Sequence, residues 1–230
     1  MSGSGSSARS GGPVRSLEQN SAPRLLQDAL TLRQVLTKDI RFPDPRGGKG
    51  AFGGPVLVAL CGLPGTGKSH FARELLKKVA LVVLETDRLR KVLVPKPKYT
   101  RGEHARVFRV CHLLIEEYLT QGQRVLFDAT NLTEQARGPL YQIADRLGCS
   151  LALVGFTAPR DLVKQRLSQR VPGRNHGDFS DATWQIHCRM RPFEEAIQRP
   201  HIMVDTSQDI SQALDQVLAM ISNPHCEQIP

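Results

Sequence analysis

One eight-residue stretch has the residue types and spacing needed to bind a triphosphate. It follows the pattern G-x4-G-K-S, directly after an apolar run and before a helix-like segment. Glycines let backbone N–H groups wrap around phosphate oxygens, and the start of the helix adds a positive dipole end. The lysine adds a full charge, and the serine hydroxyl can bind Mg²⁺. The pattern therefore predicts a site for ATP and Mg²⁺ formed by Gly62, Leu63, Pro64, Gly65, Thr66, Gly67, Lys68 and Ser69.

A carboxylate follows the second apolar run, within the sequence Leu-Glu-Thr-Asp-Arg-Leu-Arg. At the end of a parallel strand, Asp87 would face the cleft beside the phosphate loop and could accept a proton from an attacking hydroxyl. Arg90 lies one helical turn further on and could hold an anionic part of the acceptor. The alternative for Asp87, that it caps the following helix, is compatible with the catalytic role.

The third apolar run ends in Phe-Asp-Ala-Thr-Asn. An aspartate at this position in a phosphate-loop protein usually supports Mg²⁺, so Asp128 is predicted to act there with Ser69. Thr130 and Asn131 could contact the acceptor or, equally, cap the helix that starts at Glu134.

Two arginines four residues apart, Arg166 and Arg170, precede a polar, glycine-containing segment over 171–180 that includes Arg174. On a lid, these guanidinium groups could neutralise charge developing at the γ-phosphate. The alternative is a basic helix face in contact with solvent. The loop at 205–207, Asp-Thr-Ser, gives only a weak indication of a nucleotide-base contact, and the seven histidines have no metal-ligand spacing, so we expect surface or packing roles for them.

The elements that must position these residues alternate regularly along the chain. Short Val-, Leu- and Ile-rich runs predict strands at 56–61, 80–84, 124–127, 151–156 and 201–204. Helix-like segments lie at 68–78, 101–121, 134–147, 159–170, 181–198 and 210–221. This alternation predicts a three-layer α/β P-loop fold with a five-stranded, mainly parallel sheet and a helical lid, and a ligand at the carboxyl ends of the strands.

Composition divides the chain into five parts. Residues 1–21 are Ser/Gly-rich and predicted to be a disordered tail, and residues 22–41 carry apolar positions at three- and four-residue steps, typical of an amphipathic helix. We expect this helix to pack on its own domain rather than on a partner protein. Residues 42–54 form a Gly/Pro linker, 55–222 the P-loop domain and 223–230 a C-terminal tail.

The whole chain has ordinary globular composition, with 230 residues of which 40% are hydrophobic and 23% charged. No apolar run approaches a membrane span, and the five scattered cysteines favour a reducing, cytoplasmic setting over a disulfide scaffold. The formal net charge of +9 is compatible with a nucleotide or nucleic-acid partner, and equally with a merely solubilising surface.

Together, the phosphate loop, the Thr-Asp-Arg-Leu-Arg and Phe-Asp-Ala-Thr-Asn-Leu motifs, the arginine pair and the late Phe-Glu-Glu at 193–195 resemble the P-loop kinases grouped with polynucleotide 5′-hydroxyl kinase and the zeta toxins. The resemblance covers about residues 56–207. It implies that Asp87 acts as base on the acceptor hydroxyl, that Arg90 contacts an acceptor phosphate, and that Arg166 or Arg170 is the lid arginine. Ala196 stands where many members have proline.

These observations predict an ATP-dependent kinase that transfers the γ-phosphoryl group to an alcohol acceptor, either a polynucleotide 5′-hydroxyl or a small molecule. Two alternatives stay open. One is an ATP-binding regulatory protein without kinase activity, and the other is a basic nucleic-acid-binding module. The low aromatic content, 5%, counts modestly against the second, because base stacking requires aromatic side chains.

Overall fold

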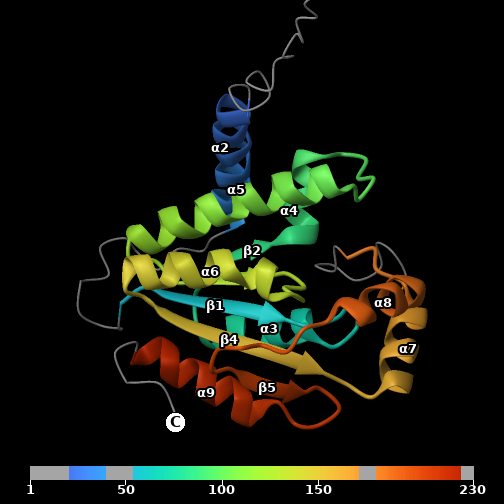
Figure 1. The fold of residues 1–230 in the computed structure, drawn as a ribbon. Helices are drawn as coiled ribbons and strands as arrows, with labels where there is room; N and C mark the ends of the chain where they lie inside the picture. The colour runs from blue at the N-terminus through green and yellow to red at the C-terminus, as the bar shows by residue number, and fades with distance from the viewer. Residues whose placement is uncertain (1–20, 40–53, 171–179, 224–230) are drawn as a thin grey trace, which may run out of the picture.

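The computed structural model describes residues 21–39, 54–170 and 180–223. The predicted tails, the linker and the centre of the predicted lid, with Arg174, therefore lie largely outside the described residues. Five strands form one sheet in the order β2-β3-β1-β4-β5, and every pairing between neighbours is parallel (Figure 1). Their bounds are β1 Val56–Cys61, β2 Val82–Glu85, β3 Val125–Asp128, β4 Ser150–Thr157 and β5 Ile202–Asp205.

Strand β1 lies at the centre of the sheet, and all six of its residues are buried. Its side chains alternate between two hydrophobic cores, with Leu57, Ala59 and Cys61 on one face and Val56, Val58 and Leu60 on the other. A strand covered on both faces must be apolar throughout, which explains the uninterrupted sequence Val-Leu-Val-Ala-Leu-Cys. The carboxyl end of this strand is therefore fixed where the phosphate loop begins.

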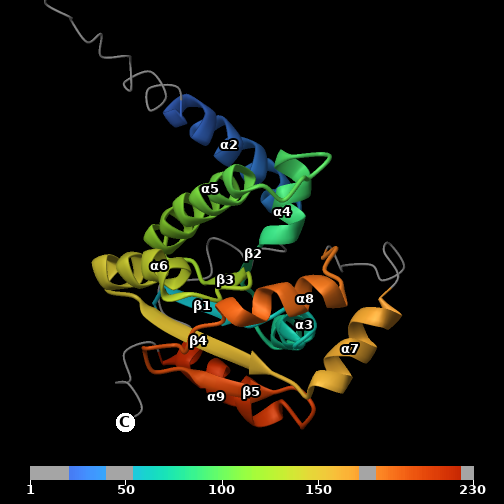
Figure 2. The same ribbon diagram turned by 45° about the vertical axis from the view of Figure 1, so that its right-hand side comes forward.

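Helices cover both faces of the sheet (Figure 2). Helices α5 (Arg101–Thr120) and α6 (Glu134–Leu147) contribute to the first core, while α3 (Lys68–Lys78) and α9 (Ser211–Ser222) contribute to the second. The predicted three-layer α/β architecture is thus confirmed, with a sheet that is entirely parallel.

Three further helices, α4, α7 and α8, lie near the carboxyl ends of the strands. Helix α4 (Thr86–Leu93) follows β2 directly, and α7 (Arg160–Gln169) and α8 (Trp184–Met190) flank the predicted lid segment (Figures 1 and 2). A 3₁₀ turn over Arg191–Phe193 continues from α8.

The long helix predicted over 181–198 is wrong, because α8 spans only Trp184–Met190. Pro192 cannot donate the backbone hydrogen bond that would extend the helix. Beyond it, the Glu195 N–H donates to the Leu132 carbonyl at 2.9 Å, so the backbone leaves the helical path and runs towards β5.

The N-terminal helix α2 (Ser21–Asp39) packs against α5 and α4. Leu32 and Leu36 are buried in the first core, and Asp28 accepts two hydrogen bonds of 2.6 Å from the guanidinium group of Arg106 in α5.

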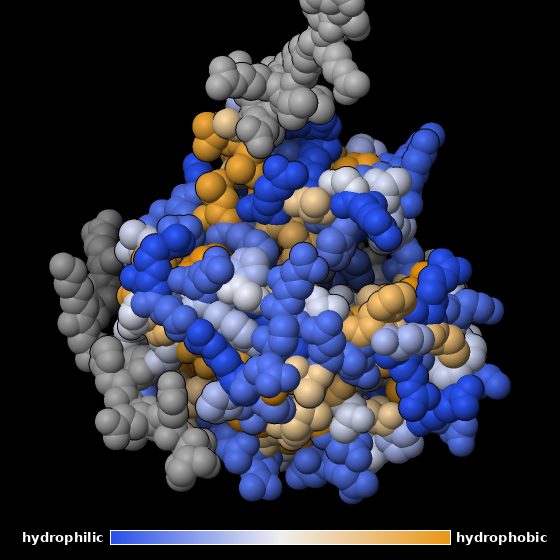
Figure 3. Space-filling model, in the orientation of Figure 1, coloured by the Kyte–Doolittle hydropathy of each residue, from blue (hydrophilic) through white to orange (hydrophobic). Residues whose placement is uncertain are grey.

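The opposite side of α2 faces solvent. Leu26 and Leu30 are 59% and 47% exposed, and Figure 3 shows hydrophobic colour over this helix. Most of the face in Figure 3 is hydrophilic, and among the described helices none combines the length and apolarity of a membrane span.

Candidate active site

A cleft of about 1050 Å³ opens near the carboxyl ends of β1, β2 and β3. The structure brings most of the residues predicted from sequence into its wall, namely Pro64, Gly65, Gly67, Lys68, Ser69, Asp87, Arg90, Asp128, Thr130, Arg166 and Arg170. The cleft therefore brings together residues that the sequence predicts to bind the nucleotide and residues that it predicts to contact the acceptor.

The phosphate loop is held in its shape by two glycines with left-handed backbone. Gly65 has φ 83°, and a Cβ there would lie 2.9 Å from side-chain carbons of Val163 and Leu167 in α7. Gly67 has φ 97°, and a Cβ there would lie 2.8 Å from Thr206. Because only glycine tolerates both the backbone angle and the close approach, the loop can pack directly under α7 and Thr206.

Lys68 lies inside the loop, with its Nζ donating to the carbonyl oxygens of Gly62 at 2.8 Å and Leu63 at 2.9 Å. Burial lowers the pKa of this ammonium group, and the nearby Asp128 carboxylate opposes the shift. The two carbonyl bonds keep the ammonium group at the loop, where a phosphate oxygen would be its natural partner.

Ser69 and Asp128 come together at the start of α3 and the end of β3, and the Ser69 hydroxyl donates to Asp128 Oδ2 at 3.2 Å. Burial raises the pKa of Asp128, while Lys68 and the Ser69 hydrogen bond oppose this. A hydroxyl beside a buried carboxylate is a donor set that suits Mg²⁺, which takes one or two protein oxygens and completes its shell with water and phosphate. The described residues contain no group of three or more His, Cys, Asp or Glu side chains that could hold a metal ion.

Asp87 is the second residue of α4 and lies in its first turn. Glu85 occupies the N-cap position of this helix, without a capping hydrogen bond from its side chain. Asp87 is not the N-cap residue itself, so capping does not explain it. Arg90 follows on the same helix and is only 4% exposed, with its guanidinium group 5.1 Å from the ring centre of Tyr99. Its Nε and Nη1 are buried and find no hydrogen-bond acceptor among the described residues.

Tyr99 itself has φ 53°, an uncommon conformation for a residue with a side chain. Its hydroxyl donates to Asp181 at 2.6 Å, and Lys91 of α4 donates to the same carboxylate at 2.8 Å. The residues just after the predicted lid thus contact α4 and the loop that follows it.

Arg166 lies inside α7 and Arg170 is its C-cap residue, and the two side chains have different surroundings. Arg166 donates to the hydroxyl of Thr206 at 2.7 Å and to the Thr206 carbonyl at 2.9 Å. Thr206 in turn donates to the Thr66 carbonyl at 2.8 Å, and Arg166 also donates to the Gly65 carbonyl of the phosphate loop at 3.5 Å. The charge of Arg170 acts on Lys68 and on Asp181. Arg166 therefore connects the loop after β5 to the phosphate loop, and the charge of Arg170 acts on the lysine of that loop.

Thr130 lines the cleft, but Asn131 does not. The side chain of Asn131 is buried and donates to the Leu60 carbonyl at 2.8 Å. Neither residue caps α6, since the side chain of Thr133 accepts from the Ala136 N–H. Asn131 thus stabilises the carboxyl end of β1, just before the phosphate loop, and does not face the cleft.

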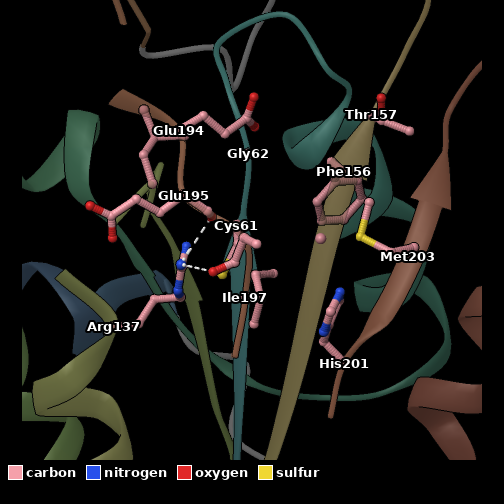
Figure 4. Close-up of a pocket in the computed structure, with 13 residues that line it drawn as sticks. Cys61, Gly62, Arg137, Phe156, Thr157, Glu194, Glu195, Ile197, His201 and Met203 are labelled. Carbon is pink, nitrogen blue, oxygen red and sulfur yellow. Dashed lines mark hydrogen bonds between the residues drawn. The ribbon is translucent and has the colours of Figure 1, made fainter. Parts of the chain in front are cut away.

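Sequence reasoning missed Arg137, the largest fully buried side chain among the described residues. Its guanidinium group donates to the carbonyl oxygens of Asn131, Glu195 and Ala196 at 2.7, 3.0 and 2.9 Å, and to the Glu134 carboxylate at 2.8 Å. Figure 4 shows this side chain pointing towards the segment that carries Glu194 and Glu195. The local sequence of α6 does not single out this arginine, because two of its four partners, Glu195 and Ala196, come from a distant segment.

The segment held by Arg137 borders a smaller cavity of about 370 Å³ beside the ends of β1, β4 and β5 (Figure 4). Met203 and Phe156 lie next to each other in its wall, and Cys61 lies in the wall on the side of Ile197 and Arg137. Burial raises the pKa of the Cys61 thiol to about 12, so this sulfur stays protonated and unreactive. Glu194 and Glu195 of the late Phe-Glu-Glu motif line this cavity, Phe193 is exposed, and none of the three lines the large cleft.

Comparison with known proteins places the chain in a family. Residues 57–192, more than half of the chain, match the family described as AAA domain. The chain belongs to this family of P-loop kinase domains. An L-seryl-tRNA(Sec) kinase from Methanococcus maripaludis is 28% identical over 73% of this chain and 67% of its own length.

Solved structures show the same kinase fold. Kti12 from Chaetomium thermophilum superposes with a TM-score of 0.58 and 16% identity, covering 72% of this chain and 98% of its own. A gluconokinase from Sinorhizobium meliloti gives a TM-score of 0.51 and 19% identity, covering 74% of this chain and 93% of its own. At these identities the likeness concerns the fold.

Proposed function

We propose that this chain is an ATP-dependent phosphotransferase that moves the γ-phosphoryl group of ATP to an alcohol hydroxyl. The observation that carries the proposal is the shared cleft, which Asp87 lines together with Lys68, Ser69 and Asp128. Phosphoryl transfer needs little more from a protein than such positioning and charge neutralisation.

The roles within the phosphate site follow from chemistry and position. Backbone N–H groups of the loop and the Lys68 ammonium group bind the β- and γ-phosphates. Ser69 and Asp128 would hold Mg²⁺, which when bound neutralises charge on the phosphate oxygens. Asp87 orients the acceptor hydroxyl and accepts its proton as the oxygen bonds to phosphorus.

Of Arg166 and Arg170, we assign the contact with the γ-phosphate to Arg170. Its charge acts on Lys68, and Arg166 holds Thr206 and the Gly65 carbonyl through its two Nη groups. In this assignment Arg166 supports the nucleotide site indirectly, by fixing Thr206 against Thr66 and Gly67.

The acceptor carries an anionic group in this proposal, and Arg90 binds it. A buried guanidinium group with unused N–H donors is costly, so a ligand anion that accepts those bonds would relieve the cost. The kinases to which the chain is similar have different substrates in their names, a seryl-tRNA and gluconate. Membership of the family therefore supports the reaction, and the acceptor is left to experiment.

The test is transfer of labelled γ-phosphate from ATP to pooled acceptors, in which phosphorylated and neutral alcohols and a 5′-hydroxyl oligonucleotide are included. We expect label on an anionic acceptor with the wild-type protein, and none with Lys68→Ala. Tight ATP binding without transfer to any member of a broad panel would contradict the proposal and support an ATP-binding regulatory protein. Oligonucleotide binding that weakens steeply with salt, without transfer, would support the nucleic-acid-binding module.

A further inference from the structure

We propose that His187 is a positioning residue for the phosphate loop, which sets the direction of the Gly65 N–H group and couples nucleotide binding to α8. This inference rests on the proposed function, because it concerns the same nucleotide site. Its starting point is that His187 is the only buried residue of α8, at 5% exposed.

The buried histidine contacts the loop directly. Its Nδ1 lies 2.9 Å from the carbonyl oxygen of Pro64, from which it is separated by 123 residues in sequence. Because a carbonyl oxygen can only accept, Nδ1 carries the proton in this hydrogen bond. The carbonyl oxygens of Gly62 and Leu63 accept from side chains of the loop itself, and those of Gly65 and Thr66 accept from Arg166 and Thr206. The Pro64 carbonyl instead receives its bond from α8.

This bond fixes a peptide plane. In a trans peptide the C=O of one residue and the N–H of the next point in opposite directions, and the structure has no cis peptide bonds among its described residues. With the Pro64 carbonyl turned towards His187, the N–H of Gly65 is turned away from α8. Gly65 lines the cleft, so its N–H is one of the donors available to a phosphate.

The imidazole ring is itself held in place by a stack. The Trp184 ring lies one helical turn earlier, with ring centres 5.1 Å apart and planes 11° apart, and the Arg160 guanidinium group lies 5.5 Å from the Trp184 ring centre. Arg160 is the first residue of α7, so the stack links both helices that flank the predicted lid to the loop.

Helix α8 also contributes to the wall of the cleft through Ile186, Arg189 and Met190. The hydrogen bond of His187 therefore joins the phosphate loop to a helix that faces the acceptor region. Nucleotide binding that favours one orientation of the Pro64–Gly65 peptide therefore also favours the position of α8 that keeps this hydrogen bond. By linkage, that position of α8 favours nucleotide binding to the same extent.

Two substitutions separate the hydrogen bond from the stack. His187→Phe keeps a ring beside Trp184 but cannot donate, and His187→Asn offers an amide N–H in place of Nδ1. Isothermal titration calorimetry with MgADP should show about three- to tenfold weaker binding for His187→Phe, and nearly wild-type binding for His187→Asn. His201→Phe is the matched control, since His201 also lies 2.9 Å from a backbone carbonyl oxygen but is exposed and outside the cleft.

Trp184 supplies an independent readout, because it is the only tryptophan of the chain. Its emission should respond to MgADP in the wild-type protein and in His187→Asn. In His187→Phe the response should be lost although nucleotide still binds at higher concentration. If the ring had only a structural role, its replacement would lower the thermal stability. The Trp184 response to MgADP would then be the same in the phenylalanine and asparagine variants.

Each result has a definite meaning. Equal MgADP affinity and an intact Trp184 response in His187→Phe would overturn the inference while leaving the proposed function standing. Equal weakening in His187→Phe and His187→Asn would also overturn it, because the donated hydrogen bond would then not matter. Absence of MgADP binding by the wild-type protein would overturn the proposed function and the inference together.

Discussion

At the scale of single residues, the phosphoryl transfer that we propose depends most on Asp87. Replacing it by asparagine removes the proton acceptor while keeping the size and shape of the side chain. We expect Asp87→Asn to lower the rate of phosphoryl transfer about 10²- to 10⁴-fold, with little change in nucleotide affinity. Initial rates with an identified acceptor and calorimetry with MgADP would measure the two effects.

Asp161→Asn provides a matched control, because Asp161 is also an acidic residue in the first turn of a helix, α7, but is exposed and does not line the cleft. Its transfer rate should stay close to wild type. Similar losses in both variants would indicate a helix-end effect and would remove Asp87 from the proposed mechanism.

His112 predicts a dependence of stability on pH. It lies in a ladder of rings, with Phe108 and Phe127 at 6.0 and 6.1 Å, and burial lowers its pKa from 6.5 to about 4. Between these values the unfolded chain binds a proton that the folded protein does not bind, so the free energy of unfolding falls as the pH is lowered through this window. Neutral His112 makes its full contribution to the free energy of unfolding above pH 6.5. Protonation of the unfolded chain removes at most about 3 kcal/mol of that free energy near pH 4.

Denaturant unfolding at several pH values would measure this loss. His112→Phe should show a shallower decline between pH 6.5 and 4 than the wild-type protein, because phenylalanine suits the apolar ladder and does not titrate. Parallel pH profiles for the two proteins would show that His112 is not the group responsible.

At the scale of elements, the contact between the phosphate loop and α7 depends on Gly65. Gly65→Ala places a Cβ against Val163 and Leu167 and forces an L-residue into a left-handed conformation. We expect it to abolish measurable nucleotide binding, or to displace α7, and to lower the free energy of unfolding by about 1–3 kcal/mol.

Gly138→Ala is the control for this prediction. Gly138 lies inside α6, where an added Cβ would meet no atom within 4 Å apart from its chain neighbours. Because Pro139 follows it and opposes a Cβ on the preceding helical residue, alanine should change the free energy of unfolding by no more than about 1 kcal/mol, without effect on nucleotide binding. Normal MgADP binding by Gly65→Ala would contradict the close packing described for the loop.

The segment between the 3₁₀ turn and β5 is held by Arg137 of α6. Arg137→Met leaves the carbonyl oxygens of Asn131, Glu195 and Ala196 without their donor, so we expect a loss of about 2–4 kcal/mol in the free energy of unfolding. Arg146→Met, which breaks an exposed ion pair with Glu116, should change stability by less than about 1 kcal/mol. Chemical denaturation would compare the two, and equal losses would exclude a special role for Arg137.

The elements also show where sequence reasoning succeeds. Strands and helices close to the phosphate loop were predicted within a few residues, because buried parallel strands and the loop itself leave strong local patterns. The segment over 181–198 was misread as one helix, since its path depends on Leu132 and on Arg137, which are distant in sequence. His187 was likewise invisible as a loop contact, because only the folded chain brings α8 to Pro64. Local chemistry can be predicted from spacing, whereas a contact made across the fold cannot.

At the scale of the whole molecule, α2 belongs to the core of the domain. Leu32 is fully buried, so Leu32→Ala should lower the free energy of unfolding by about 2–4 kcal/mol. Leu26→Ala on the solvent-facing side of the same helix should change it by less than about 0.5 kcal/mol. Thermal and chemical denaturation of both variants would measure the difference, and equal effects would contradict the packing of α2 on α5.

The order of strands in the sheet has a consequence for synthesis on the ribosome. β1 comes first in the sequence but takes the central place, and its two neighbours, β3 and β4, begin 69 and 94 residues later. An emerging chain must therefore carry six residues that are destined for burial, without both neighbouring strands, until Thr157 has been translated. During that interval the unpaired edges of β1 expose an apolar stretch of the kind that makes incompletely folded chains prone to aggregation.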